Sequence, residues 1–168
     1  VVSTGTWVVV MALGAPIDGL NPARDTLINV DALGFPVPTA RFMGGRDFEE
    51  LLGSESVEPT PEEIESAMLS DVRVLPTNNE QKTRWSANPA LLSKGEKAAL
   101  ISVFLAEETA VRLELIGAQG TIYVEGPFCK NGVFTSHLAA LTNRPVKYDH
   151  SSSTGTAAGA AMLTIRQQ

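Results

Sequence analysis

The sequence has 168 residues, with 13 Lys and Arg against 19 Asp and Glu, so its formal net charge at pH 7 is −6. A hydrophobic fraction of 43% and a charged fraction of 19% are those of a folded domain and exclude a largely disordered chain. The acidic balance argues against nucleic acid or an anionic membrane as partners, and the single cysteine excludes an internal disulfide framework.

The first third of the chain predicts two strands and a short helix. Residues 7–13 are rich in β-branched side chains and predict a buried strand, and residues 26–31 alternate loosely and predict a second. The glycine and prolines at 34–38 are expected to end that second strand. A short helix is expected over residues 48–52.

Two longer helices have clear start signals. Thr60 and Ser93 are each followed three residues later by a glutamate, which is the spacing of a capping box. The helix after Ser93 is expected to run to about Ile116 and to stop at Gly117. Residues 71–89, between the two helices, are polar and predict a long excursion.

The last third of the chain alternates between strand and helix patterns. Strands are expected over 120–124 and 146–148, and helices over 133–141 and 156–163. A sharp turn is expected at Gly126-Pro127. This alternation predicts an α/β fold with right-handed crossovers.

The first candidate site is the segment Thr4-Gly5-Thr6, directly before a predicted strand. A tight turn at Gly5 lets backbone N–H groups converge on an anion, and the hydroxyls of Thr4 and Thr6 add donors. Phosphate binding there needs no lysine. An ordinary β-turn is the alternative interpretation.

The second candidate site lies at the carboxyl end of the strand at 120–124, where open α/β sheets bind ligands. Gly126 lets a ring or ribose approach the backbone, and Asn131 either bonds a base or caps the next helix. A third candidate is the hydroxyl-rich segment 151–156 with the small residues after it, which suit close helix packing as well as an anion.

Other reactive residues are interpreted structurally. His137 and His150 belong to no cluster of metal-binding side chains, so no protein-built metal site is expected. Cys129 is interpreted as a small hydrophobic residue near a turn. Ser-His-Asp catalysis is not expected, because the chain has no nucleophile-elbow pattern.

In this order, the segments resemble the C-terminal domain of the FGGY family of carbohydrate kinases. The resemblance rests on Thr4-Gly5-Thr6 for the phosphate turn, 93–116 for a long helix, Gly126 and Asn131 for a glycine turn with an asparagine, 139–146 for Ala-Asp-x-x-Gly-Arg-Pro-Val, and 156–161 for Thr-Ala-Leu-Gly-Ala-Ala. Trp7, directly after Gly-Thr, is most similar to the fuculokinase and rhamnulokinase branches.

The resemblance implies an actin-like, ribonuclease-H-like ATPase fold with a mixed sheet flanked by helices. It also implies transfer of the ATP γ-phosphoryl group to a sugar hydroxyl with Mg²⁺. Gly5 and Thr6 would then hold the β/γ-phosphate, and Gly126 with Asn131 would lie against adenosine. Thr156 and Gly159 would shape the floor below the nucleotide.

The resemblance further implies that residues 1–168 are one half of a two-domain kinase. The catalytic aspartate and the N-terminal sugar-binding domain would precede Val1, so this chain alone is expected to be inactive. The partners implied are a ketose or polyol, ATP and the missing domain, and a homodimer is a further option. With no targeting signal and one thiol, the expected location is the cytoplasm.

The chain departs from the family pattern at three positions. Pro127 stands where the second glycine of the adenosine turn is usual, which removes a backbone donor. Asn143 replaces a glycine, and Ala140 replaces an aspartate. One alternative is therefore a noncatalytic actin-like module with a decayed nucleotide site. Another is a different actin-like enzyme, such as an acetate-kinase-type or hydantoinase-type ATPase.

Overall fold

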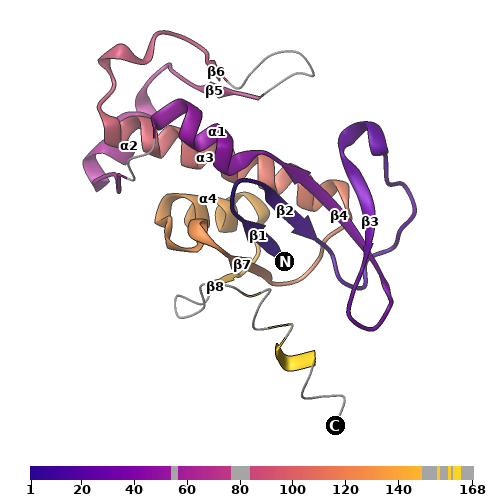
Figure 1. Ribbon diagram of the computed structural model, residues 1–168. Helices are drawn as coiled ribbons and strands as arrows, with labels where there is room; N and C mark the ends of the chain where they lie inside the picture. Colours follow the sequence, from indigo (N-terminus) through magenta and orange to yellow (C-terminus); the bar gives the residue numbers. More distant parts are fainter. Residues whose placement is uncertain (54–56, 77–83, 149–154, 156–158, 160, 164–168) are drawn as a thin grey trace.

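The computed structural model describes residues 1–53, 57–76, 84–148, 155, 159 and 161–163 (Figure 1). One mixed sheet has the strand order β3-β4-β2-β1-β7-β8. Its strands are β1 (Val2–Thr4), β2 (Val8–Met11), β3 (Thr26–Val30), β4 (Pro36–Phe42), β7 (Ile122–Glu125) and β8 (Val146–Tyr148). The pairings β1–β7 and β7–β8 are parallel, and the other three are antiparallel.

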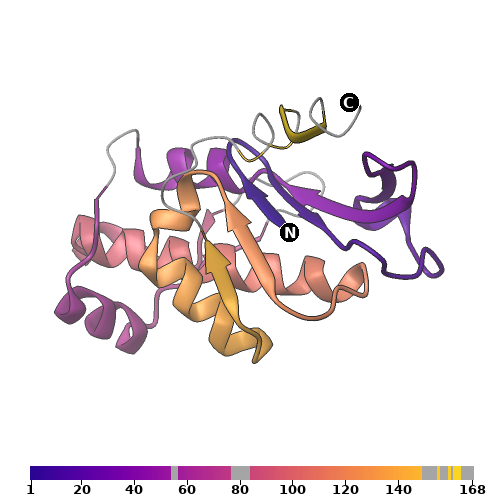
Figure 2. The ribbon, with the colours of Figure 1, turned by 90° about the horizontal axis from the view of Figure 1, so that it is seen from below.

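Helices flank this sheet, as the fold class predicts. They are α1 (Gly44–Leu52), α2 (Pro61–Leu69), α3 (Lys94–Leu115) and α4 (Gly132–Thr142), with 3₁₀ turns at Pro22–Arg24, Pro89–Leu91 and Pro127–Lys130. The long helix α3 packs against α4, α2 and α1 and against β2 and β4 (Figure 2). None of the described helices combines the length and the apolar character needed to cross a membrane.

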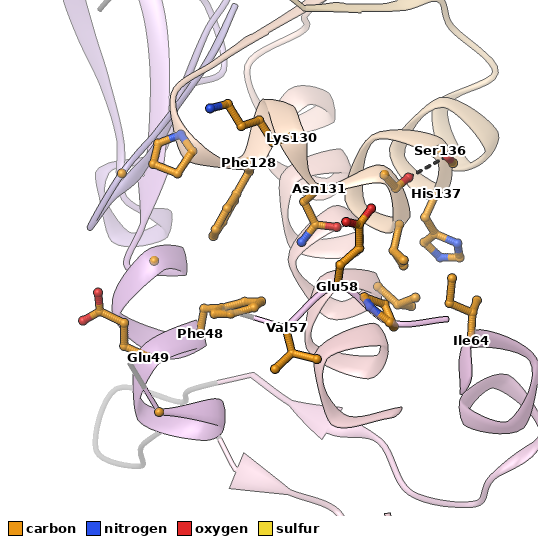
Figure 3. Close-up of a pocket in the computed structure, with 18 of the residues that line it drawn as sticks. Phe48, Glu49, Val57, Glu58, Ile64, Phe128, Lys130, Asn131, Ser136 and His137 are labelled. Atoms are coloured by element: carbon orange, nitrogen blue, oxygen red, sulfur yellow. Dashed lines mark hydrogen bonds between the residues drawn. The ribbon is translucent and has the colours of Figure 1, made fainter. Parts of the chain in front are cut away.

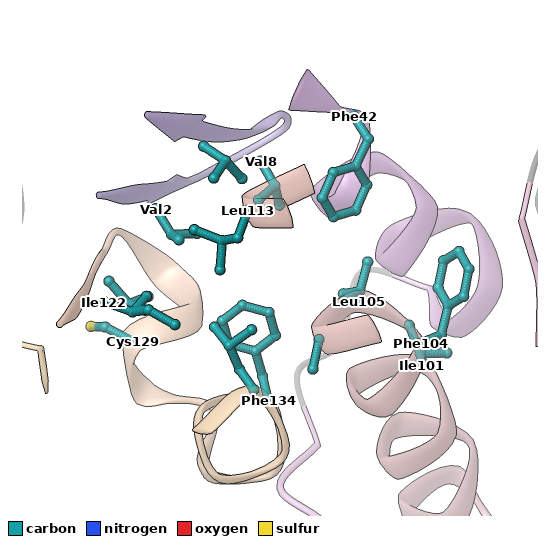
Figure 4. Close-up of a cluster of buried hydrophobic side chains, with 14 of the residues drawn as sticks. Val2, Val8, Phe42, Ile101, Phe104, Leu105, Leu113, Ile122, Cys129 and Phe134 are labelled. Atoms are coloured by element: carbon teal, nitrogen blue, oxygen red, sulfur yellow. The ribbon is translucent and has the colours of Figure 1, made fainter. Parts of the chain in front are cut away.

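The hydrophobic core lies between the sheet and helices α3 and α4 (Figure 4). Val2 and Val8 project from β1 and β2 and are fully buried, together with Leu105 of α3 and Phe134 of α4. Burying a side chain of this size contributes about 1.5–3 kcal/mol. These contacts hold the strand ends and the helix starts in a fixed relation.

The strand predictions are confirmed in part. The predicted strand 26–31 is β3, and the predicted strand 7–13 is the shorter β2. The expected end of the second strand is confirmed, because β3 ends at Val30, but Pro36 and Pro38 lie within a further strand, β4, which pairs with β3 and β2 and was not predicted. The short strand β1 was also missed.

Prolines are tolerated in β4 because of where β2 ends. The carbonyl of Pro38 accepts a hydrogen bond from the N–H of Ala12, which follows the last residue of β2. The nitrogen and carbonyl of one residue point to the same side of an antiparallel strand. The missing N–H of Pro38 therefore falls beyond the end of the β2 ladder and costs no pairing.

Both predicted capping boxes are present, and they interlock. Thr60 and Glu63 cap each other at the start of α2, and Ser93 and Glu96 do so at the start of α3. The Ser93 hydroxyl also donates to Glu63 Oε1 at 2.6 Å, and the Ser66 hydroxyl donates to Glu96. The starts of the two helices are thus joined by side chains of both.

The remaining elements lie close to their predicted positions. Strands β7 and β8 and helix α4 match their predicted positions, and α3 ends before Gly117. In the predicted excursion 71–89, β5 (Val74–Leu75) pairs with β6 (Arg84–Trp85). Of the predicted helix 156–163, residues 159 and 161–163 are helical, and the rest lie outside the described residues.

Because of the interlocked capping boxes, the free energy of unfolding should fall at acid pH. The Ser93 hydroxyl and the Thr60 N–H lower the pKa of Glu63, and the Ser66 hydroxyl and the Ser93 N–H lower the pKa of Glu96, both from the ordinary value of 4.5. The resulting stabilisation is present above the unfolded value and is lost as pH falls through the lowered pKa values. Between pH 5 and about pH 3, the wild-type unfolding temperature should fall more steeply than that of a Glu63→Gln, Glu96→Gln double variant.

Glu65→Gln is the control, because Glu65 lies on α2 outside both capping boxes. That variant should keep the wild-type pH dependence. Equal slopes in the wild type and the double variant would contradict the assignment.

Candidate functional site

Two turns lie side by side at one edge of the sheet. Strands β1 and β7 are parallel neighbours, with Ser3 opposite Glu125, so their carboxyl ends meet. The turn around Gly5 follows β1, and the 3₁₀ turn Pro127–Lys130 follows β7. The fold therefore brings together two segments that the sequence singled out from opposite ends of the chain.

Thr4 joins these two turns. Its hydroxyl donates to the carbonyl of Glu125 at 2.6 Å and accepts from the N–H of Phe128 at 3.1 Å. The Thr4 residue is only 7% exposed. The sequence pattern predicted that this hydroxyl donates to a ligand, but its one hydrogen is already used within the protein.

Gly126 lies behind the same junction. Its φ of +83° is in the left-handed region. A Cβ at this position would overlap the carbonyl oxygen of Thr4. The glycine is therefore required by the close approach of the two turns and by its backbone conformation, independently of any ligand.

The turn after β1 is also held by the start of α1. Its own closure is a hydrogen bond from Gly5 N–H to Trp7 O at 3.0 Å, and Arg46 N–H donates to Thr6 O at 3.3 Å. A Cβ at Gly45 would overlap the Gly5 carbonyl. This contact was not predicted. The sequence signal for it is the pair of glycines at the start of α1, because glycine weakens a helix and is used where two backbones approach closely.

A cleft of about 1080 Å³ lies in front of the two turns (Figure 3). Gly5 and Thr6 line it on the α1 side, where Gly5 lies against Gly45, and Ile64 of α2 lies at the opposite end (Figure 3). Ala140 of α4 also lines it. The volume of the cleft is slightly above the usual range of small-molecule sites, which is about 300–1000 Å³. The cleft can accommodate an elongated ligand with one end at the turn after β1.

The predicted site residues fall into three groups. Gly5, Thr6 and Asn131 line the cleft, whereas Thr4 and Gly126 are not among its lining residues. Gly159 is exposed and does not line it. Thr156 lies outside the described residues.

Asn131 has two structural roles at the edge of the cleft. Its side-chain oxygen accepts from Phe134 N–H at 3.0 Å and caps α4, and its amide nitrogen donates to Ser102 Oγ at 2.8 Å. The helix-cap interpretation is thus confirmed. The contact of Asn131 with a base stays a prediction.

Aromatic side chains line the middle of the cleft and were not predicted from the sequence. The rings of Phe48 on α1 and Phe128 have centroids 5.9 Å apart, and both residues line the cleft beside Pro127. Apolar rings in such a position suit a flat ligand group. Each phenylalanine lies within three residues of a site glycine, which is the only local signal for their role.

Charged side chains of both signs line the cleft. They are Glu49 and Glu58 on one wall and Lys130 on the other, and His137 also contributes. Within the described part of the chain, no three His, Cys, Asp or Glu side chains gather closely enough to hold a metal ion. Lys130 offers a positive charge to an anion in the cleft.

Comparisons with known proteins agree with this geometry. A family model described as "Carbohydrate kinase FGGY, C-terminal domain" matches residues 1–168. A carbohydrate kinase from Novosphingobium aromaticivorans is similar at 32% identity and a TM-score of 0.81, over 98% of this chain and 40% of that one. No curated protein matches the chain.

Two more distant structures share the fold. A xylulose kinase from Bifidobacterium adolescentis has 18% identity and a TM-score of 0.67, over 95% of this chain and 35% of its own length. A glycerol kinase from Plasmodium falciparum, solved with ADP, has 12% identity and a TM-score of 0.64, over 96% of this chain and 37% of its own length. This chain thus spans well under half of each of these kinases.

The junction at Gly126 can be tested against a second left-handed glycine. Gly120 has a φ of +71° and open space within 4 Å of the point where a Cβ would lie, whereas a Cβ at Gly126 meets Thr4. Gly120→Ala should cost about 1–2 kcal/mol of unfolding free energy from backbone strain alone. Gly126→Ala should cost at least about 1 kcal/mol more because of overlap, measured by urea unfolding. Equal costs would contradict the close approach of the two turns.

Proposed function

This chain belongs to the FGGY carbohydrate kinase family, as a C-terminal domain, and from that premise we propose that it forms the ATP-binding wall of a sugar kinase. The intact protein would phosphorylate a hydroxyl of a ketose or polyol. The sugar-binding domain and the catalytic base would lie outside this chain. The proposed location is the cytoplasm, where ATP is supplied.

One observation carries the proposal. The turn Gly5-Thr6 and the start of α4 at Asn131 line the same cleft, although they lie far apart in the sequence. The cleft has the volume and the mixed lining that a nucleotide requires. The P. falciparum glycerol kinase of similar fold was solved with ADP, which supports a nucleotide as the ligand.

The residues suggest one orientation for ATP. Its phosphates would meet the turn at Gly5 and Thr6. Because the Gly5 N–H already donates to Trp7 O, the donors there would be the N–H and the hydroxyl of Thr6. Its base would lie toward the opposite end, between Ile64 and Met68 of α2 and Ala140 of α4. Phosphoryl transfer needs this kind of positioning more than covalent help from the protein.

Mg²⁺ would neutralise charge on the transferred phosphoryl group. The described residues do not form a carboxylate cluster for it. Mg²⁺ bound to nucleotides keeps most of its ligands as water and phosphate oxygens, so this chain need not supply a cage. We therefore assign no residue of this chain as a metal ligand.

A noncatalytic module with a decayed nucleotide site is the second candidate, and Pro127 favours it. Proline removes one backbone donor from the turn after β7. Pro127 nevertheless lines the cleft without closing it, and the neighbouring N–H of Phe128 is used by Thr4. Pro127 therefore removes one hydrogen-bond donor from the site, but it does not block the cleft to a ligand.

Filling the cleft tests the proposal. Ala140→Trp should place an indole at the base end and weaken Mg·ADP binding to the full-length protein at least about tenfold, measured by calorimetry. Leu141→Trp is the matched control, because Leu141 is 48% exposed and does not line the cleft. That variant should bind like the wild type.

A coupled ADP-release assay with a panel of ketoses and polyols tests the activity itself. Turnover of one of them that is lost in Ala140→Trp would support the kinase. Tight Mg·ADP binding without turnover of any sugar would favour the noncatalytic module. A wild-type protein that binds no Mg·ADP would contradict the proposed function.

A further inference from the structure

We propose that Thr4 is a positioning residue whose hydroxyl couples the phosphate end of the cleft to its base end. The proposal rests on the proposed function, because it concerns how the same cleft binds a nucleotide. It assigns to Thr4 a role without direct ligand contact. The role depends on one oxygen atom that bridges two segments of the chain.

The bridge is built from two partly buried hydrogen bonds. Thr4 Oγ1 donates to Glu125 O at 2.6 Å and accepts from Phe128 N–H at 3.1 Å. A hydroxyl both donates and accepts at one small atom. Valine has the shape of threonine but satisfies neither bond, so Thr4→Val removes the bridge with little change in volume.

The bridge connects directly to the phosphate end of the cleft and, through Asn131, to the start of α4, the helix on which Ala140 lines the base end. On one side, Gly5 and Thr6 follow Thr4 along the chain and line the phosphate end. On the other side, Phe128 donates to Thr4 through its N–H and accepts from Asn131 N–H through its carbonyl at 3.1 Å. Two consecutive hydrogen bonds therefore lead from Thr4 to Asn131, where α4 begins.

This arrangement sets the spacing between the two ends. A ligand that contacts both ends binds tightly only when their separation matches its length, because the second contact is then made without further ordering. A ligand that contacts one end gains nothing from the spacing. Loss of the bridge should therefore weaken the binding of a whole nucleotide much more than the binding of either of its parts.

The test uses the full-length protein and three probes: Mg·ADP, adenosine and Mg·pyrophosphate. Thr4→Val should weaken Mg·ADP binding about tenfold and change the affinity for adenosine and for pyrophosphate by less than about threefold. Thr4→Ser keeps the hydroxyl and should bind all three within about twofold of the wild type. Dissociation constants are measured by calorimetry, with competition for the weak probes.

Thr109→Val is the matched control for a lost buried hydroxyl. Thr109 is fully buried, and its hydroxyl donates to Leu105 O at 2.7 Å within α3, away from the two turns. This variant should lose stability comparable to that of Thr4→Val and should keep its affinity for Mg·ADP. If Thr4→Val does not fold, Thr4→Ser and Thr4→Ala give the same comparison, because they differ by the hydroxyl oxygen.

The outcomes separate this proposal from the one it rests on. Two results would overturn the coupling role alone, provided that the wild type binds Mg·ADP. Thr4→Val could lose affinity equally for all three probes, or it could lose no affinity for Mg·ADP. A loss in Thr4→Ser as large as in Thr4→Val would also overturn it. A wild-type protein that binds no Mg·ADP would overturn the proposed function and the coupling role together.

Discussion

The parallel pairing of β1 with β7 is the constraint on which the site depends. It is short, with Val2 opposite Val124 and Ser3 opposite Glu125. Both valines are buried at 3% exposure or less, so the register is held by the core as well as by the ladder. A slip by one residue would turn Val2 toward the opposite face and would separate Thr4 from its partners.

Apolar packing and hydrogen bonding make different contributions to this molecule. A buried aliphatic or aromatic side chain contributes about 1.5–3 kcal/mol, whereas one hydrogen bond contributes a net 0.5–1.5 kcal/mol, roughly. The core beneath the sheet therefore supplies most of the stability. The bonds of Thr4, Asn131 and Arg46 contribute less energy and determine how the turns are oriented around the cleft.

Local signals made some elements predictable from the sequence. Helices α2 and α3 were found because a capping box is a pattern within four residues. Strand β8 was found because Val146 and Tyr148 directly follow a helix stop. Strand β1 has three residues, too few to show a period. Strand β4 was not predicted because it contains prolines. A strand tolerates them here because β2, its neighbour, ends before their missing N–H groups are needed.

The candidate site was predictable only in part, because local signals identify some of its residues and the others depend on contacts between distant segments. Gly5, Thr6 and Asn131 were found from glycine turns and a family resemblance, and they line the cleft. The walls supplied by α1 and α2 were missed because they depend on contacts across the chain, such as that of Gly45 with Gly5. The hydroxyl of Thr4 was assigned to a ligand because its actual partners lie more than a hundred residues away.

That separation also governs when the site can form during folding. One bond of Thr4 spans 121 positions of the sequence and the other spans 124, so each closes a loop of more than two thirds of the 168-residue chain. Contacts of such high sequence separation form late, after the loop-closure entropy has been overcome by the core. A partly folded chain would hold the helices and the β2–β4 ladder without a binding site. Any ligand of the cleft would accordingly stabilise only the completed domain and would slow its unfolding through mass action.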